Sequence, residues 1–219
     1  MFYRFSNFLV RLLLRLLTRY KVSGLEFVPS TGPLVVAANH LSLIDPPMLG
    51  ALLPRKATFM AKEELFKAPL VGWVVAAYGA FPVRRGEADR QALRAALKLL
   101  EQGQAIGMFP EGTRSKMARL QPAHAGAALV ALRSGAPILP VGIVGTHKIL
   151  TWPRILFRPE FELRFGPTFR LEQPTGMSGR NSLAECVGQM MRHVAALLPP
   201  ENRGVYGEDR ERIERTIIA

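Results

Sequence analysis

The sequence predicts an α/β fold: a single domain with a central, largely parallel mixed sheet flanked by helices, preceded by an N-terminal amphipathic helix. Short apolar runs of strand length alternate along the chain with segments of helical periodicity, which is the pattern of an α/β domain. Hydrophobic residues make up 48% and charged residues 21% of the chain, as in globular proteins rather than disordered ones. A length of 219 residues suits one compact domain with a terminal appendage.

The first 20 residues have the pattern of an amphipathic helix. Polar residues recur at steps of three or four and share one face: Arg4, Asn7, Arg11, Arg15 and Thr18. The opposite face is apolar and consists of Phe2, Phe5, Leu9, Leu12, Leu13, Leu16 and Tyr20. The longest uncharged run is too short for a transmembrane span or a signal peptide. We expect a helix in the plane of a membrane surface, with arginines toward anionic headgroups; a helix docked on the protein's own core is the alternative.

The rest of the chain predicts alternating strands and helices. The expected strands are Leu34–Ala38, Thr58–Ala61, Ala80–Val83, Ala105–Phe109, Ile138–Val144 and Phe161–Phe165. The expected helices are Ala88–Gln102, Gly126–Arg133 and Ser182–Leu198. A further apolar stretch, 68–83, contains two prolines and is too short to cross a membrane, so it is either core or dips into one leaflet. The predicted units are therefore residues 1–24 (interfacial helix), 25–200 (α/β domain) and 201–219 (charged, loosely docked tail).

The charge balance predicts an anionic partner. Lys and Arg number 29 against 17 acidic residues, a net charge of +12. Nucleic acid, a membrane surface and a phosphorylated substrate all fit such a surplus. A nucleic-acid binder is disfavoured because the aromatic residues fall mostly in apolar runs rather than among exposed bases. The lone Cys186 excludes a disulfide framework and a Cys-rich zinc site, and we expect a reducing compartment.

His40 and Asp45 form the first pair that predicts chemistry, because they follow a buried-strand pattern. On one continuous helix, a spacing of five residues would put the two side chains about 140° apart. Asp45 precedes Pro46, which favours extended geometry at Asp45, a helix start at Pro46, and therefore an N-cap role for Asp45. The carboxylate can then reach one imidazole nitrogen of His40 and leave the other free as a base. A loop histidine beside an ordinary helix cap is the alternative.

A second candidate segment, Phe109–Ser115, places charged residues and a glycine directly after a buried strand, where α/β proteins build sites. It is not a P-loop, because Thr113-Arg114 stands where such a loop has Lys-Ser/Thr. Arg114 can bind a phosphate in a bidentate fork, and Glu111 can orient either Arg114 or the histidine. A structural Glu111–Arg114 ion pair is the alternative.

Two further segments carry weaker signals. Gly79–Gly86 reads as a strand that ends in two bases, Arg84 and Arg85, one of which can reach a phosphate; two surface arginines are the alternative. Ile138–Ile143 reads as a buried strand with a proline and by itself says almost nothing about function.

In order along the chain, the four segments resemble the sequence blocks of the glycerolipid acyltransferases that make phosphatidic acid, the 1-acyl-sn-glycerol-3-phosphate acyltransferases. The matching blocks are Asn39-His40…Asp45, Gly79–Arg85, Phe109–Arg114 and Leu139–Val141. The match runs from about Gly32 to Val144, and Lys62 resembles a lysine often found between the first two blocks. The chain departs from the family where Ala123-His124 replaces Phe-Lys. His124 would then be the basic residue in place of the family's lysine.

The resemblance implies transfer of a fatty acyl group from a thioester, acyl-CoA or acyl-ACP, to the sn-2 hydroxyl of lysophosphatidic acid, giving phosphatidic acid in phospholipid biosynthesis. His40 would be the general base and Asp45 would orient it. The residues that would bind the substrate phosphate are Arg85 (favoured over Arg84 by its spacing from Gly79), Arg114 and Lys62. The supporting residues are Asn39, Glu111, Gly112 and Thr113, with backbone amides near Gly112–Thr113 as candidate oxyanion donors. No metal or cofactor is implied, because a thioester is already activated.

The expected partners are membrane lipids of an anionic bilayer surface and the acyl donor, which includes acyl carrier protein, but not nucleic acid. The expected location is the cytoplasmic face of the cell membrane, peripheral through the N-terminal helix. Two alternatives stay open. One is the same chemistry on another acceptor, glycerol 3-phosphate or a lyso-ornithine-type lipid. The other is a non-catalytic basic lipid-binding protein on the same fold.

Overall fold

A seven-stranded mixed sheet lies at the centre of the computed structural model, which describes residues 2–67, 72, 75, 80–83, 90–172 and 179–207. The strand order is β1-β7-β6-β2-β5-β3-β4, and every neighbouring pair is parallel except β6–β7. The strands are β1 (Arg19–Ser23), β2 (Leu34–Ala38), β3 (Ala57–Lys62), β4 (Phe81–Val83), β5 (Ala105–Met108), β6 (Ile138–Val144) and β7 (Glu160–Phe165). The predicted fold class is confirmed.

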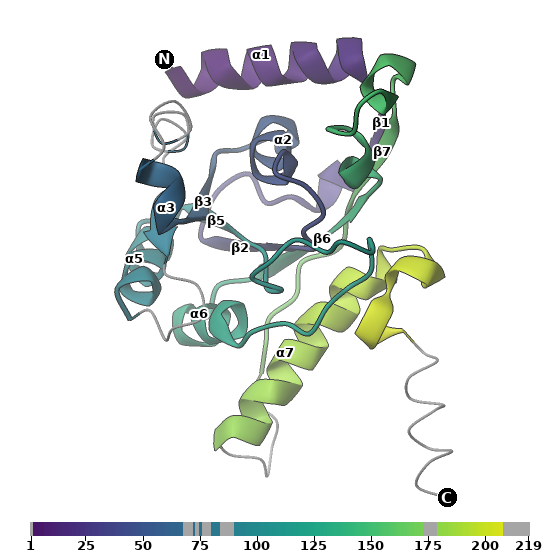
Figure 1. Ribbon diagram of the computed structural model, residues 1–219. Helices are drawn as coiled ribbons and strands as arrows, with labels where there is room; N and C mark the ends of the chain where they lie inside the picture. The colour runs from purple at the N-terminus through teal and green to yellow at the C-terminus, as the bar shows by residue number, and fades with distance from the viewer. Residues whose placement is uncertain are drawn as a thin grey trace, which may run out of the picture.

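Helices cover both faces of this sheet (Figure 1). They are α1 (Phe2–Leu17), α2 (Asp45–Leu52), α3 (Glu63–Lys67), α5 (Arg90–Glu101), α6 (Gly126–Ser134) and α7 (Gly179–Ala196). Short 3₁₀ turns are η1 (Leu25–Phe27), η2 (Thr146–Lys148), η3 (Arg154–Phe157), η4 (Pro200–Asn202) and η5 (Gly204–Tyr206). Figure 1 shows α2 on one face with α1 lying across it, and α6 and α7 on the other face.

The alternation of side chains along β2 explains the two-sided core. Val35 and Ala37 pack into the cluster that α5, α6 and α7 cover, whereas Leu34, Val36 and Ala38 pack on the α2 side. All five are fully buried. A central parallel strand covered on both faces is expected to be apolar throughout, because neither face meets water.

The N-terminal 24 residues do not form one helix, so the predicted boundary at residue 24 is wrong. Helix α1 ends at Leu17, and Arg19–Ser23 form β1 at the edge of the sheet, parallel to β7. Exposed and half-buried residues alternate along β1, which is the period of a strand rather than of a helix. Tyr20, predicted on the apolar helix face, stacks instead on Phe161 of β7 with ring centroids 5.2 Å apart.

Helix α1 docks on the protein through a mixed face that contains the buried Asn7 and Leu14, and Thr18 is buried just after its last residue. The Tyr3 hydroxyl and the Asn7 amide donate to the carbonyl of Gly50 at 3.2 and 3.3 Å, and Arg11 Nε donates to the carbonyl of Ala51 at 2.5 Å. Both carbonyls lie in the last turn of α2, where backbone oxygens have no partner within the helix. The expectation that all the arginines face outward is therefore wrong for Arg11.

The apolar face of α1 is left in solvent. Its exposed residues are Phe5, Phe8, Leu9, Leu12, Leu13, Leu16 and Leu17. Docking on the protein's own core, the alternative considered from the sequence, thus occurs through the side opposite to the one expected. No helix in the described part of the chain combines the length and the hydropathy needed to cross a membrane.

The predicted C-terminal tail begins inside the domain rather than outside it. Leu120 N donates to Asn202 O at 2.9 Å, and the Asn202 amide donates to Ala118 O at 2.6 Å. Val205 N donates to Leu120 O at 3.3 Å. Residues 201–207 therefore hold the segment that follows the second candidate site segment. Residues 208–219, and most of the apolar stretch 68–83, lie outside the described residues.

Candidate active site

The site residues gather at the edge where the parallel strands end. His40 follows β2, and Phe109 follows the neighbouring strand β5 directly. Because β2 and β5 run parallel, with Ala37 opposite Met108, their carboxyl ends meet at one edge of the sheet. Ligand sites of open α/β sheets lie at this edge.

His40 and Asp45 are joined by a buried hydrogen bond. Nδ1 of His40 lies 2.9 Å from Oδ2 of Asp45. Both residues are buried, and Asp45 has no exposed surface. Because a carboxylate only accepts hydrogen bonds, Nδ1 carries the proton and Nε2 keeps the lone pair that makes imidazole a base. The predicted pair is confirmed in its geometry.

The turn between the two residues is organised by Asp45 itself. Its Oδ2 also accepts the backbone N–H groups of Leu41 and Ser42, at 2.6 and 2.7 Å. The carboxylate therefore points back toward the preceding turn, and α2 begins at Asp45 with Ile44 as its N-cap. The prediction that Asp45 caps α2 is wrong. The side chain is already used by three donors that precede it in the chain.

An aromatic ring fixes the plane of the imidazole. His40 stacks on Phe109 with ring centroids 4.3 Å apart and an interplanar angle of 26°. Phe109 in turn lies 6.2 Å from the ring of Phe59 in β3. The His40 ring is thus held by one hydrogen bond and one stacked ring. Sequence reasoning missed this support, whose only signal was an aromatic residue at the end of a strand.

Glu111 binds the backbone of His40 and does not pair with Arg114. Its Oε1 accepts the N–H of His40 at 2.9 Å, and its Oε2 accepts the N–H of Gln121 at 2.9 Å. Both carboxylate oxygens are therefore engaged by backbone donors, while Arg114 is exposed. Burial raises the pKa of Glu111, against the opposing effect of these hydrogen bonds. Of the two roles left open by the sequence, the structure supports the one on the histidine side.

Asn39 ties the end of β2 to β6. Its amide nitrogen donates to the carbonyl of Ile143 at 2.9 Å, and its amide oxygen accepts the N–H of Ile143 at 2.7 Å. On the other side, Ser115 N donates to the carbonyl of His40 at 2.8 Å. The backbone that presents His40 is consequently fixed on both sides by buried hydrogen bonds.

The loop after β5 turns sharply at Gly112, which has a φ of +66°. The Gly112 amide donates to the carbonyl of Phe109 at 2.9 Å, so it is already used and is not free to stabilise an oxyanion. A Cβ at this position would lie 2.8 Å from Cδ2 of His124, which places the His124 ring against the loop. Thr113 and Arg114 are exposed beside it.

The structure describes only the backbone of Lys62 among the other predicted phosphate ligands. Lys62 is the last residue of β3, and its backbone pairs with Val83 at the end of β4. Arg85, together with Arg84 and Gly79, falls outside the described residues. Arg114, which is exposed, is thus the predicted phosphate ligand whose side chain is described. Among the described residues, no cluster of three or more His, Cys, Asp or Glu side chains could hold a metal ion.

Comparisons with known proteins identify the family to which the chain is similar. A sequence model of the acyltransferase family matches residues 19–144. A chloroplastic 1-acyl-sn-glycerol-3-phosphate acyltransferase of Brassica napus is 36% identical over 59% of this chain and 38% of its own length. The 1-acyl-sn-glycerol-3-phosphate acyltransferase of Bacillus subtilis is 32% identical over 65% of this chain and 71% of its own length. A lyso-ornithine lipid O-acyltransferase of Pseudomonas aeruginosa is 37% identical over 51% of this chain and 43% of its own length.

The fold has a solved counterpart. The crystal structure of the 1-acyl-sn-glycerophosphate acyltransferase PlsC from Thermotoga maritima matches with a TM-score of 0.68 at 27% identity, over 89% of this chain and 78% of that chain. The matches span about two fifths of the length of the plant relatives. The region matched by the family model contains His40, Asp45 and the loop after β5. The chain belongs to the acyltransferase family.

Proposed function

We propose that the protein transfers a fatty acyl group from a thioester to the sn-2 hydroxyl of lysophosphatidic acid and so makes phosphatidic acid. The observation that carries this proposal is the buried His40–Asp45 hydrogen bond of 2.9 Å at the carboxyl edge of the sheet. The names of the plant and Bacillus relatives support the same reaction. The residues in place suit it, because an alcohol needs a base within hydrogen-bond reach to attack at neutral pH.

The proposed reaction needs one base and no covalent enzyme intermediate. Nε2 of His40 takes the proton of the acceptor hydroxyl while the oxygen attacks the carbonyl carbon of the thioester. The tetrahedral intermediate collapses with cleavage of the C–S bond, and the imidazolium returns the proton to the departing thiolate. The products are the ester and the free thiol of the donor. Asp45 stabilises the imidazolium and keeps the tautomer that leaves Nε2 free.

The acceptor phosphate would be held by basic residues near the loop after β5. Arg114 is exposed there, and the His124 ring lies against the same loop. Arg85 and Lys62 remain proposed ligands of this phosphate. A phosphate held in this way would fix the distance between the sn-2 hydroxyl and Nε2, which is how a positioning group raises the rate. With the Gly112 amide used by Phe109, the Thr113 amide is the remaining candidate oxyanion donor.

A membrane-bound acceptor fits the exposed face of α1. This face presents seven large apolar side chains to solvent, and no acidic residue precedes Glu26. A helix of this kind lies in the headgroup region of an anionic bilayer. We therefore propose peripheral binding to the cytoplasmic face of the cell membrane through α1.

A second acceptor is favoured by one observation, the match to the lyso-ornithine lipid O-acyltransferase of Pseudomonas aeruginosa. Acceptor and donor profiles separate the two readings. The purified protein is assayed with lysophosphatidate, glycerol 3-phosphate and lyso-ornithine lipid, each with acyl-CoA and with acyl-ACP. We expect the highest kcat/KM with lysophosphatidate. A higher value with lyso-ornithine lipid would support the second candidate, and vesicle binding without turnover of any acceptor would favour a non-catalytic lipid-binding protein.

A further inference from the structure

A second apolar surface lies in the connection between β6 and β7. We call residues 150–158 the apolar loop. Four of its large side chains are exposed: Leu150 (57%), Trp152 (75%), Leu156 (64%) and Phe157 (78%). Trp152 and Phe157 are more exposed than Phe5 of α1, whose exposed fraction is 65%. Large apolar side chains exposed together on one segment indicate a binding surface.

The apolar loop is attached to the C-terminal end of α1. Nη2 of Arg158 donates to the carbonyls of Arg15 and Thr18, at 2.8 and 3.1 Å. Arg19 N donates to the carbonyl of Pro159 at 3.2 Å. Figure 1 shows the loop beside this end of α1, at the same end of the molecule. The two apolar surfaces are consequently neighbours in space although more than 130 residues separate them in the sequence.

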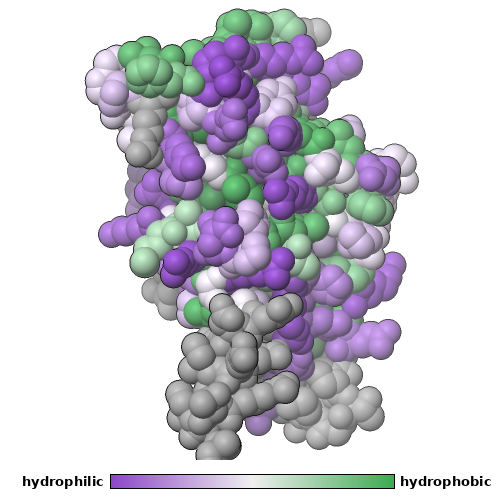
Figure 2. Space-filling model, turned by 90° about the vertical axis from the view of Figure 1, so that its right-hand side faces the viewer, coloured by the Kyte–Doolittle hydropathy of each residue, from purple (hydrophilic) through white to green (hydrophobic). Residues whose placement is uncertain are grey.

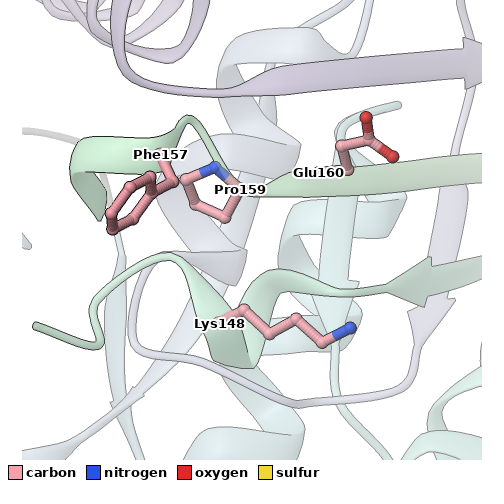
Figure 3. Close-up of a pocket in the computed structure, with 4 residues that line it drawn as sticks. All are labelled: Lys148, Phe157, Pro159 and Glu160. Atoms are coloured by element: carbon pink, nitrogen blue, oxygen red, sulfur yellow. The ribbon is translucent and has the colours of Figure 1, made fainter. Parts of the chain in front are cut away.

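The base of the loop is anchored in the core. Ile149 is buried, and Lys148 N donates to the carbonyl of Gly145 at 3.0 Å. Between the two ends of the loop lies a shallow cavity of about 320 Å³ lined by Lys148, Phe157, Pro159 and Glu160. Figure 3 shows Lys148 from η2 and Phe157 from η3 on opposite sides of this cavity. The exposed side chains of the loop therefore project from a segment that is packed against the domain.

The two segments that carry these surfaces contain basic but no acidic residues, and Glu160, the first acidic residue after the loop, is paired with Arg19. Residues 146–159 contain Lys148, Arg154 and Arg158 but no acidic residue, and the same is true of the five bases in residues 1–25. Figure 2, viewed from the side where α1 ends, shows hydrophobic surface at the top of the molecule with hydrophilic residues directly beside it. Trp side chains with adjacent bases are typical of surfaces that enter the headgroup region of an anionic bilayer.

We propose that the apolar loop inserts into an anionic membrane next to α1, so that the two form one membrane-binding surface. This inference rests on the proposed membrane role of α1 and adds a second contact that sets the orientation of the enzyme. Two separate contacts fix a tilt that one helix alone leaves free. The loop follows β6 at the carboxyl edge of the sheet, so its insertion would turn the edge that carries His40 toward the lipid.

Fluorescence of Trp152 tests insertion directly. The chain contains two tryptophans, so Trp73→Phe leaves Trp152 as the sole reporter. With phosphatidylglycerol vesicles we expect a blue shift of its emission and quenching by lipids brominated on the acyl chain. Unchanged emission from vesicle-bound protein would overturn the inference. An emission change that instead follows protein concentration without lipid, together with a dimer by light scattering, would assign the surface to a second copy of the chain.

Vesicle sedimentation separates the loop from α1. Full burial of one large apolar side chain is worth roughly ten- to a hundredfold in binding, so Trp152→Ser and Phe157→Ser should each weaken binding to these vesicles by up to about a hundredfold. Phe27→Ser is the matched control. Phe27 lies in η1, which follows the end of β1, whereas the apolar loop precedes the beginning of the neighbouring parallel strand β7. Circular dichroism confirms that each variant is folded.

The loop variants and the α1 double variant distinguish the loop inference from the proposed membrane role of α1. If Phe5→Ser with Leu16→Ser weakens binding but the loop variants bind like wild type, the loop inference is wrong and the role of α1 stands. If the loop variants weaken binding and the α1 variant does not, the loop is the membrane contact and the proposed role of α1 is wrong. If wild type itself does not bind anionic vesicles, both are wrong.

Discussion

At the level of single side chains, the Asp45 carboxylate both pairs with His40 and stabilises the turn between the two residues. The same oxygen accepts from the imidazole of His40 and from the amides of Leu41 and Ser42. The first bond selects the tautomer, and the other two shape the turn that brings the imidazole over the carboxylate. Under the proposed mechanism, substitutions of Asp45 change both catalysis and folding, so each substitution needs a readout for both.

Asp45→Asn tests the orienting role. An amide keeps the shape of the side chain but can donate to Nδ1, which selects the wrong tautomer of His40. We expect kcat to fall by about 10²–10⁴. Steady-state kinetics measures this, with urea unfolding as the control for the lost carboxylate acceptor. A variant within a few-fold of wild-type kcat would remove Asp45 from the mechanism.

Glu111 carries a prediction about pH. Burial raises the pKa of Glu111 in the folded protein, so the native state binds its proton more tightly than the unfolded chain does. The stability that this proton contributes is full below the unfolded pKa of about 4.3 and is lost as pH rises through the raised value. Glu111→Gln removes the titration. The free energy of unfolding of wild type minus that of the variant should therefore decrease with rising pH in this window, and a flat difference would contradict it.

Arg114 is the described candidate for contact with the acceptor phosphate. A charge-assisted hydrogen bond is worth about 1.5–3 kcal/mol, so Arg114→Ala should raise KM for lysophosphatidate by about ten- to a hundredfold. The KM for an acceptor without phosphate should stay the same. Arg119→Ala is the matched control, because Arg119 is another exposed arginine five residues further along the chain. Equal losses on both acceptors would assign Arg114 another role.

At the level of helices and strands, the clearest predictions from sequence were those with a single strong pattern. The bounds expected for β2 and β6 are the observed ones, because a short run of buried apolar residues has few other interpretations. The region around β1 was misread because a helical pattern of 3.6 residues runs directly into a strand pattern of two. Thr18 to Ser23 are too few residues for either period to dominate.

The docking of α1 could not be predicted from its own pattern. A polar face normally points to water, but Asn7 and Arg11 find the free carbonyls at the end of α2. That partner depends on where α2 ends and on the packing of two helices whose hydrogen-bonded residues are 40 or more positions apart in the sequence. The sequence identified most of the exposed apolar side chains of α1, but it misplaced Tyr20 and could not show which side of the helix meets the protein.

The exposed face of α1 predicts a separation of membrane binding from stability. Phe5→Ser together with Leu16→Ser removes apolar area that is mostly in solvent, since both side chains are more than 60% exposed. We expect weaker sedimentation with anionic vesicles and a free energy of unfolding within about 0.5 kcal/mol of wild type. Arg11→Ala should behave in the opposite way, with lower stability because its α2 carbonyl loses a partner. If the double variant binds vesicles like wild type, the membrane contact lies elsewhere.

At the level of the whole molecule, the fold brings the chemistry and the apolar surfaces to one edge. The parallel strands end at the edge where β7 and β1 begin, because β6 and β7 are antiparallel. His40 follows β2 at this edge, while α1 and the apolar loop both join the sheet there. Under the proposed function, an acceptor held in a bilayer would meet His40 at the same edge of the sheet as α1 and the apolar loop.

The same global view shows what the sequence leaves out of the site. His40 and Asp45 are five residues apart and could be paired from local geometry and Pro46 alone. The contact between Glu111 and the backbone of His40 joins residues 71 apart and depends on the register of β2 with β5. Gln121, which fills the other oxygen of Glu111, carried no sequence signal, because an amide in a loop is common and its partner is set only by the fold.

The most direct test of the proposed reaction compares wild type with His40→Ala. Each protein is incubated with lysophosphatidate vesicles and a long-chain acyl thioester, and phosphatidic acid is measured, with circular dichroism to verify folding. A base in the transition state contributes about 10²–10⁴, so wild type should form phosphatidic acid and the variant should be slower by that factor. A folded variant within tenfold of the wild-type rate would contradict the assignment of His40 as the base.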